Sequence, residues 1–538
     1  MLSEISMNHE IRADYHQVDL LPQCLEDWVP ADHPARYIRE FVDALDLREL
    51  GFGERKSEEG RPNYAADLLL KVWLYGYLTR IRSTRGLERA CREHLSLLWL
   101  TGRHTPDHNT LWRFFREHRE GLREVYRAGV KVAAEQGLVG MVYQAVDGTK
   151  IAAASSRRTV EHRKELEKAL ERVEASLSEM EAEVEAAEKV ERGEYALPEE
   201  LQEGKKLRQA IQESLAKMGE AKREHLHPQE PEARLMPCEG RKDPAYNAQA
   251  VVDAEAGIMV AEEAVNAESD SALLVPMLEE VAANLGGVAQ QTVADGGYSS
   301  AQQLGEAEAR GYEVLVGAGT ETGGAKRGAY ESAKFEYQRE ADEVLCPQGK
   351  KLKFEGEKNK GPQRPAVRSY RCQDYPQCPV RELCSGRRDG RRIEVSPQRA
   401  AVMRQREKRR DPTQQALLRR RKAIVEPVFA TLKQALGFRR WTVRGLENVR
   451  TQWALLCAAF NLKKMYKHWA AIRATPAVSP LPGETAALPA HPYLLAFLLL
   501  RLPVVRRPPG EREEGKWRKV LTADHLPPSA RCFLLTAC

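Results

Sequence analysis

Three acidic residues that lie far apart in the chain stand where a fold could bring their carboxylates together. Asp147 ends one apolar run and Asp295 ends another, in QTVADGGY, while Glu426 lies in a long helical segment. Carboxylate oxygens are the ligands that Mg²⁺ prefers, and a few suffice because the ion keeps several waters. Two such ions about 4 Å apart can neutralise the attacking and leaving oxygens of a phosphodiester. The three acids are therefore candidate catalytic residues and candidate ligands of two Mg²⁺ (or Mn²⁺) ions.

Each acid also has a simpler interpretation. Asp147 is followed by glycine, and an Asp-Gly pair between the short runs 141–146 and 150–154 predicts a β-hairpin with the acid at the end of its first strand. Asp295 can serve as a turn or cap residue, and Glu426 can pair with a neighbouring Arg or Lys. The order of the acids on the elements that carry them is what favours a common site.

Those elements predict an α/β fold, a mixed sheet flanked by helices. Strand patterns follow Tyr246 in NAQAVVDA and IMVAEEAV, and recur before Asp295 and at 312–317. Helical patterns alternate with these strands and are expected at 271–285, 301–310, 412–436 (closed by Gly437) and 446–469. Pro427 directly follows Glu426 and predicts either a kinked helix or a helix whose regular part begins near this proline.

Residues 1–135 predict a helical domain of short helices joined by turns, which suits a helix-turn-helix-like DNA-binding module. Helices are expected at 68–78, at 84–94 and from about 107 onward, where Asp107 or Asn109 can act as the cap. The third helix opens with the candidate DNA-binding residues Asn109, Thr110 and Arg113. A plain helical domain without a DNA-binding role is the alternative.

The segment 157–228 is helical, highly charged and inserted into the α/β domain. A seam of apolar residues begins at Leu166 with alternating spacings of four and three, and a second seam begins at Leu207. The break at 193–198 contains a proline, so the two helices predict an antiparallel helical hairpin. Its charges are expected to form a solvated face.

A second insertion, residues 318–410, is basic, rich in cysteine and low in periodicity. Four thiolates can hold zinc tetrahedrally, although the spacing lacks the CxxC pairs typical of zinc sites. Buried free thiols are the alternative interpretation. The candidate zinc ligands are Cys346, Cys372, Cys378 and Cys384. The other six cysteines are scattered and are expected to be structural.

A strongly basic run precedes Glu426. Between Arg404 and Lys422 nine basic residues face two acids, Glu407 and Asp411, which gives a local charge of +7. Such a cluster beside a metal site is the electrostatic footprint expected for a DNA backbone, and a solvated helix face is the alternative. Trp441 follows two arginines and is interpreted as a core residue, with stacking on an unpaired base as the other option.

With these motifs in this order, the chain resembles the large bacterial insertion-sequence DDE transposases over roughly residues 12–470. The segments that carry the resemblance are PDHNTLWRFFREH, VDGTKIAAAS, YNAQAVVDAEAGIMV, VADGGYSS and RRRKAIVEPVFATLKQALGFRR. The resemblance implies a ribonuclease-H-like catalytic domain at 136–470 behind a helical DNA-binding domain at 1–135, with the three acids as the metal ligands. It also implies a transposase that binds double-stranded DNA at terminal inverted repeats, cleaves and transfers strands, and works as a homodimer when two ends are paired.

Related members carry a Tyr, an Arg, the Glu and a Lys in the third motif, and the basic residues hold DNA phosphates. Here Lys433 lies seven positions after Glu426 on the same helix face, and Lys422, beside Arg421, falls at the place of the arginine. Arg419 takes the place of the tyrosine, which leaves the upstream DNA contacts open. The alternative function is a catalytically inactive, transposase-derived DNA-binding protein, and a scaffold built on the helical hairpin is a third hypothesis.

Bulk properties narrow the class of protein. The net charge of +5 is too mild to indicate nucleic acid by itself. The N-terminus lacks a signal-peptide pattern, and the longest strongly apolar run, 493–500, is far shorter than the roughly 20 residues that span a bilayer. We expect a cytoplasmic, nucleoid-associated protein without membrane contact, whose ten cysteines do not form disulfides. Residues 471–538 are rich in proline and predict a poorly ordered tail.

Overall fold

The computed structural model describes residues 24–53, 63–188, 199–318, 330, 334–338, 341–358, 366–385, 389–395 and 398–474. The break predicted at 193–198 and all but the first four residues of the predicted tail lie outside these residues.

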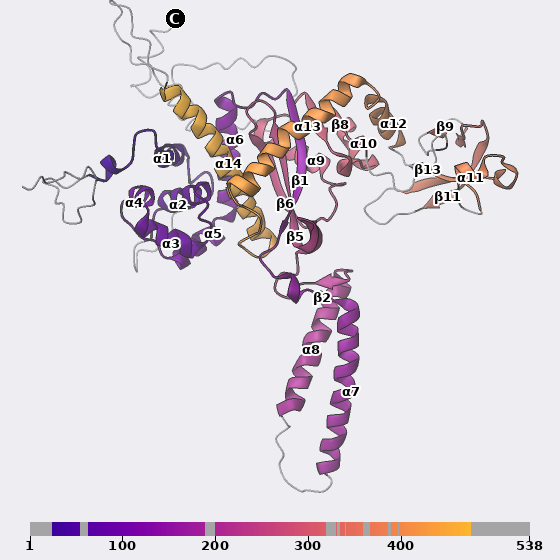
Figure 1. Ribbon diagram of the computed structural model, residues 1–538, viewed down its shortest axis with the longest axis horizontal. Helices are drawn as coiled ribbons and strands as arrows, with labels where there is room; N and C mark the ends of the chain where they lie inside the picture. Colours follow the sequence, from indigo (N-terminus) through magenta and orange to yellow (C-terminus); the bar gives the residue numbers. More distant parts are fainter. Residues whose placement is uncertain are drawn as a thin grey trace, which may run out of the picture. The chain divides into compact units, whose positions relative to one another are not determined.

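The N-terminal part is helical, as predicted (Figure 1). Its elements are η1 (Leu25–Trp28), α1 (Pro34–Ala44), α2 (Ala66–Leu78), α3 (Thr84–Glu93), α4 (Leu95–Leu100), α5 (His108–Glu117) and α6 (Arg119–Glu135). Of the two predicted caps of α5, Asp107 is the one used, because its carboxylate accepts the backbone N–H of Thr110 at 2.7 Å. The centre of α2 is buried on all sides, so this helix lies in the core rather than on a surface.

A mixed sheet forms the α/β part. Its strands are β1 (Tyr143–Ala152), β4 (Arg234–Cys238), β5 (Arg241–Asp253), β6 (Met259–Val265), β7 (Gln291–Ala294) and β8 (Val314–Val316). The strand order is β4-β5-β1-β7-β8. The strand β6 pairs with residues 247–252 of β5, on the same edge of β5 as β4. The strand β5 pairs antiparallel with β1, β4 and β6. The strand β7 pairs parallel with β1 and with β8. This mixed sheet behind N-terminal helices is the ribonuclease-H-like architecture that the sequence predicts.

The predicted hairpin around Asp147 is wrong. Residues 143–152 form one continuous strand, β1, and the Asp-Gly pair lies inside it rather than in a turn. The whole strand pairs with β5, from Gln144 opposite Asp253 to Ala152 opposite Ala245. A long partner strand therefore overrides the local turn preference of Asp-Gly.

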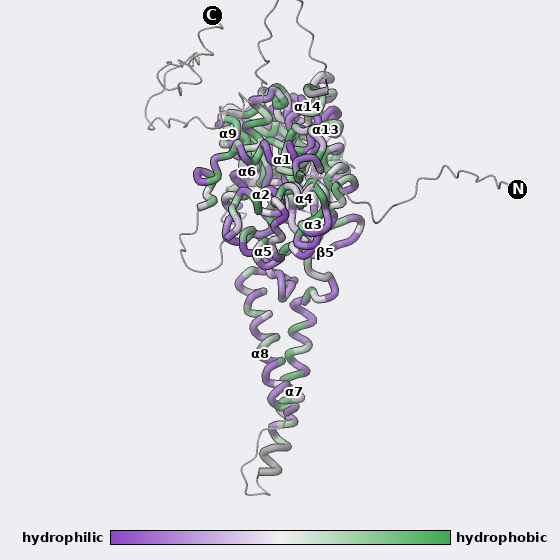
Figure 2. The backbone as a smooth tube through the Cα atoms, turned by 90° about the vertical axis from the view of Figure 1, so that its left-hand side faces the viewer, coloured by the Kyte–Doolittle hydropathy of each residue, from purple (hydrophilic) through white to green (hydrophobic). Residues whose placement is uncertain are grey.

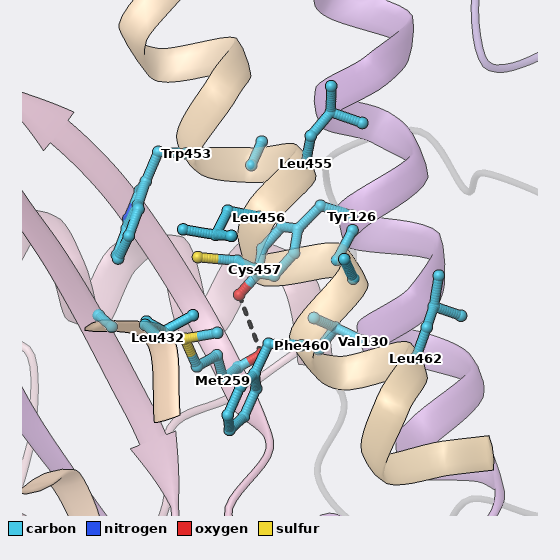
Figure 3. Close-up of a cluster of buried hydrophobic side chains, with 14 of the residues drawn as sticks. Tyr126, Val130, Met259, Leu432, Trp453, Leu455, Leu456, Cys457, Phe460 and Leu462 are labelled. Carbon is cyan, nitrogen blue, oxygen red and sulfur yellow. Dashed lines mark hydrogen bonds between the residues drawn. The ribbon is translucent and has the colours of Figure 1, made fainter. Parts of the chain in front are cut away.

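Five of the described helices pack around the sheet. They are α9 (Leu274–Leu285), α10 (Ala301–Ala309), α12 (Arg399–Lys408), α13 (Pro412–Ala430) and α14 (Leu446–Ala474), with short turns η3 (Gly296–Tyr298) and η7 (Thr431–Ala435). α13 packs on β1, β7 and β8, and α14 packs on β6, α6 and α2 (Figure 1). In Figure 3 the side chains of α14 fill the space between the sheet and α6, and the hydroxyl of Tyr126 donates to the carbonyl of Met259 at 2.9 Å.

Pro427 lies inside α13, which excludes a helix beginning near this proline. The helix continues to Ala430 and then changes to a π-turn, η7, before Gly437 ends it in the left-handed conformation at φ +67°. Proline lacks the N–H that would bond one turn back. The π-turn directly after it is a form of backbone often found at functional sites.

The predicted helical hairpin is present. α7 (Arg163–Glu188) packs against α8 (Glu199–Glu220), and β2 (Glu161–His162) pairs with β3 (His225–Leu226) at its base, next to η2 (Arg157–Thr159). Both helices are mainly hydrophilic (Figure 2). The first seam is confirmed as far as Met180, but Leu207 of the second seam is 51% exposed and faces away from the partner helix.

The cysteine-rich insertion is a sheet of its own, which the sequence did not predict. Its elements are β9 (Glu336–Gln338), β10 (Glu343–Leu345), β11 (Lys351–Lys358), β12 (Val367–Cys372), η6 (Tyr375–Gln377), α11 (Arg381–Cys384) and β13 (Arg392–Val395). All neighbouring strands are antiparallel, in the order β13-β12-β11-β10-β9. Its buried residues form a cluster separate from the main core.

A buried acid, Glu262, lies on β6, near charged residues of α6 and α9. Burial raises its pKa well above the ordinary value, and Glu263 and Glu280 act in the same direction against Arg123 and Arg127. Its Oε2 atom has no hydrogen-bond partner among the described residues. This site therefore favours the neutral carboxyl.

We expect Glu262→Gln to raise the free energy of unfolding at pH 8. A carboxyl whose folded pKa is raised contributes its full stability below the unfolded pKa, about 4.3, and loses it as the pH rises through the folded pKa. The gain should be about 1–3 kcal/mol, the usual cost of an uncompensated buried polar group. Urea unfolding at pH 4 and pH 8 measures the free energy of unfolding. The difference between Glu262→Gln and the wild type should be smaller at pH 4.

The exposed Glu279→Gln on α9 is the control and should change neither value. An equal effect of Glu262→Gln at both pH values would contradict the prediction.

Candidate functional site

Asp147 and Asp295 occupy equivalent positions on two paired parallel strands. The register of β1 and β7 places Val146 beside Ala294, so each aspartate is the next residue along its strand. Asp295 follows β7, as predicted, whereas Asp147 lies within β1 at the point where its pairing with β7 ends. The two acids therefore lie side by side, at the end of the β1–β7 pairing.

An arginine neutralises Asp147. Its Oδ1 accepts the N–H of Gly148 at 2.8 Å, and its Oδ2 accepts from Nη1 of Arg421 at 2.7 Å. Burial raises the pKa of Asp147, and the nearby Asp295 adds to this shift against the opposing pull of Arg421. Since the side chains of Asp147 and Arg421 are only 20% and 13% exposed, this ion pair lies largely out of water.

The second aspartate is fixed by a turn and a buried tyrosine. Asp295 caps η3, and its Oδ1 accepts the N–H of Gly297 at 2.8 Å. Tyr298, three residues after Asp295, is fully buried and donates to Gln249. Burial raises the pKa of Tyr298, and the carboxylates of Asp270, Asp147 and Asp295 raise it further. The three carboxylates therefore lie near enough to this hydroxyl to disfavour its ionisation.

Asp270 and its partners were missed by the sequence analysis. Lys150 of β1 donates from Nζ to both oxygens of Asp270, at 2.8 and 2.9 Å. Asn247 and Gln249 of β5 donate to the same carboxylate at 2.7 and 2.8 Å. A signal was present, because two amide side chains alternate within an otherwise apolar, buried strand.

Gly148 makes room for this network. A Cβ atom at this position would lie 2.1 Å from Nε2 of Gln249. Gln249 lies opposite Gly148 in the β1–β5 register. The Asp-Gly pair is thus explained by close packing next to Asp147 and not by a turn.

The third predicted acid lies on the helix α13. Glu426 is exposed on α13, as is Lys422, and Lys433 is half-buried in η7. In the part of the chain that the structure describes, no three His, Cys, Asp or Glu side chains form a group ready to hold a metal ion. The fold therefore brings Asp147 and Asp295 together, with Arg421 beside Asp147.

The predicted basic run is partly neutralised within the protein. Arg404 pairs with Glu308, and Lys408 pairs with Glu313. Arg409 donates to the carbonyls of Val316 and Gly317. The exposed cations that remain on α13 beside Arg421 are Arg419, Arg420 and Lys422.

A second positive surface lies next to Lys150, and we call it the basic hollow. Two adjoining hollows share Arg241, Asp243 and Arg440 in their walls. Their cationic lining consists of Lys150, Arg157, Arg158, Arg241, Lys433, Arg439 and Arg440. The only acids in the lining are Glu239 and Asp243, so the described walls carry a net positive charge. Lys150, which binds Asp270, lies where the hollow borders the three acids Asp147, Asp270 and Asp295, which we call the aspartate cluster.

Among the other predicted site residues, Asn109 and Arg113 are exposed on α5 one turn apart, and Thr110 is half-buried beside them. Trp441 is 1% exposed and its Nε1 donates to the carbonyl of Ile151 at 3.1 Å, which confirms the core interpretation.

The four cysteines of the second insertion gather in space. Cys346, Cys372, Cys378 and Cys384 all line one small cavity. Burial raises the pKa of Cys372 and of Cys384, and the other thiols of the set add to both shifts. Every described cysteine is a free thiol.

No described helix has the length and the apolar character needed to cross a membrane.

Two family models match this chain. The first, described as "Transposase domain (DUF772)", matches residues 23–117, which hold the N-terminal helices up to α5. The second, described as "Transposase DDE domain", matches residues 345–466, which hold the four cysteines, Glu426 and most of α14. A search of curated proteins gives no match. The two transposase domain matches support an insertion-sequence DDE transposase family, and the mixed sheet behind N-terminal helices is consistent with the ribonuclease-H-like fold of such transposases.

Proposed function

We propose that this transposase binds the terminal inverted repeats of its own element and catalyses metal-dependent DNA strand cleavage and transfer. The observation that carries the proposal is the pair of aspartates on neighbouring parallel strands, Asp147 and Asp295. Two rigid carboxylates beside each other can share or bridge divalent cations, whereas an isolated surface acid cannot.

The donor set fits Mg²⁺ or Mn²⁺. Both ligand candidates are hard carboxylate oxygens, and the carboxylate of Asp147 already binds a cation, the guanidinium of Arg421. Asp147 and Asp295 would hold the ions, with Glu426 of α13 as the third ligand. Bound there, the ions would stabilise negative charge on the phosphate oxygens and activate the attacking hydroxyl.

The chain's own residues would position DNA beside the aspartates. Arg421, released from Asp147 when a metal ion takes its place, would contact a phosphate together with Lys422. Lys433 lines the basic hollow, where a DNA backbone would be held by charge. On α5 the exposed Asn109 and Arg113, with Thr110 beside them, would read the repeat in the major groove.

Pairing of two transposon ends requires two active sites, so we propose a homodimer at synapsis. The protein would act in the cytoplasm, on the DNA of the nucleoid.

The test is strand cleavage by the purified full-length chain. Double-stranded DNA carrying the inverted repeats that flank the coding region is incubated with protein and Mg²⁺, and the products are separated on a denaturing gel. We expect nicks at the repeat ends that disappear when EDTA removes the metal. Scrambled repeats serve as the control and should stay intact.

One observation favours the second candidate, a catalytically inactive DNA-binding protein. Arg421 already neutralises Asp147, and Glu426 is exposed. Specific binding of the repeats without metal-dependent cleavage would select this candidate. Absence of both binding and cleavage would overturn both.

A further inference from the structure

The inserted sheet β9–β13 has few ways to stabilise itself. Its buried cluster consists of ten side chains, separate from the main core. Units of this size usually depend on disulfides or on a bound metal. Since its described cysteines are free thiols, disulfides do not supply that support.

The same sheet contains a cavity surrounded by sulfur. All four thiols of the insertion line it, and its volume is about 20 Å³, which is room for roughly one water-sized group. Among the described residues, no histidine or carboxylate lines this cavity. The cysteines are thus its only metal-ligating side chains.

The backbone around Cys346 is arranged to support a thiolate. In the tight turn CPQGK, the N–H of Gly349 donates to the carbonyl of Cys346, and the N–H of Lys350 donates to the Cys346 sulfur at 3.3 Å. Gly349 is in the left-handed conformation, φ +73°, which allows this turn. Hydrogen bonds of this kind orient and stabilise metal-bound sulfur.

Each of the four thiols comes from a different element around the cavity. Cys346 follows β10, Cys372 ends β12 and lies opposite Leu352 of β11, and Cys378 follows η6. Cys384 ends α11. An ion bound by all four would therefore join the strands to the two short helical turns after β12.

We propose that the inserted sheet holds one structural zinc ion, whose ligands are Cys346, Cys372, Cys378 and Cys384. Zinc suits four sulfur ligands because it accepts tetrahedral thiolate coordination without a geometric preference of its own. The thiols do not yet stand at coordinating positions. Zinc binding would draw the four sulfurs together and release the thiol protons to solvent. This site is independent of the aspartate cluster.

Zinc content of the purified full-length chain tests this proposal. Protein expressed with zinc in the medium and kept reduced should contain one zinc per chain by mass spectrometry of the metal. Cys378→Ser should lose it, and we choose this position because its side chain is only half-buried. Zinc-free protein loaded with Co²⁺ should show the strong visible absorption of tetrahedral cobalt–thiolate coordination.

Two variants serve as controls. Cys24→Ser changes an exposed thiol outside the sheet and should keep the zinc, as should Asp295→Asn at the aspartate cluster. A metal chelator should lower the melting temperature of the wild type but leave Cys378→Ser unchanged. Wild-type protein with reduced thiols and no stoichiometric zinc would overturn the proposal, and so would zinc retained by Cys378→Ser.

Discussion

Asp295→Asn is expected to abolish DNA strand cleavage while leaving the fold and DNA binding intact. Asparagine keeps the volume and can still accept the N–H of Gly297, but it removes the negative charge that a divalent ion requires. Loss of one preorganised electrostatic contact costs about 10²–10³ in rate, and loss of a metal ligand should cost at least as much. Cleavage of repeat DNA, gel-shift binding and thermal unfolding measure the three properties separately.

Asp147→Asn should lose cleavage to the same extent, but it is the less selective variant. It also leaves the guanidinium of Arg421 without its partner in a largely buried position, which lowers stability. Glu313→Gln is the matched control, because Glu313 directly precedes β8 of the same sheet and is exposed. If Asp295→Asn cleaved DNA at the wild-type rate, the assignment of the site would be refuted.

Trp441→Ala is expected to destabilise the protein by about 3–5 kcal/mol, the usual cost of truncating a buried tryptophan. Trp441 packs edge to face against Phe438 and Trp453, and Trp453 is itself bonded to the carbonyl of Gln249 in β5. Its own Nε1 bonds to Ile151 in β1. The ring therefore fixes the end of the α13 segment onto the strand that carries Asp147. The shift in the urea midpoint measures the loss.

Trp441→Phe separates packing from hydrogen bonding. It retains an aromatic ring but leaves the carbonyl of Ile151 unpaired, so we expect a smaller loss of about 1–3 kcal/mol. Trp112→Ala, at a half-buried position on α5, provides a comparison outside this contact. Unchanged stability of Trp441→Ala combined with weaker DNA binding would mean that the ring stacks on a base.

Strong periodicity was enough to predict most of the fold. The strands β5 to β8 and the helices α9, α10 and α14 lie where alternating or helical apolar patterns predict them, because each buries one regular face. The strand β1 was misread at Asp147. Its Asp-Gly pair carries a turn signal, while the evidence for a continuous strand lies in β5, about a hundred residues away in the chain.

The site could be predicted only as far as local sequence determines geometry. The placement of Asp295 after β7 follows from the strand pattern, and its pairing with Asp147 follows from the parallel register. The exposure of Glu426 does not follow from the local sequence, because it depends on how α13 passes Pro427 and enters a π-turn. Asp270 was missed because its partners, such as Lys150, come from other strands.

The pairing of β2 with β3 has a consequence for how the chain folds. Glu161 lies opposite Leu226, so the ends of the long α7–α8 excursion are tied together before the chain continues to β5. The entropic cost of closing a loop grows only slowly with the length of the loop. Because the β2–β3 pairing already joins the two ends of the hairpin, it removes most of that dependence on length. The register between β1 and β5 is therefore decoupled from the length of the hairpin. Evolution could lengthen or shorten this arm without shifting Asp147 along its strand.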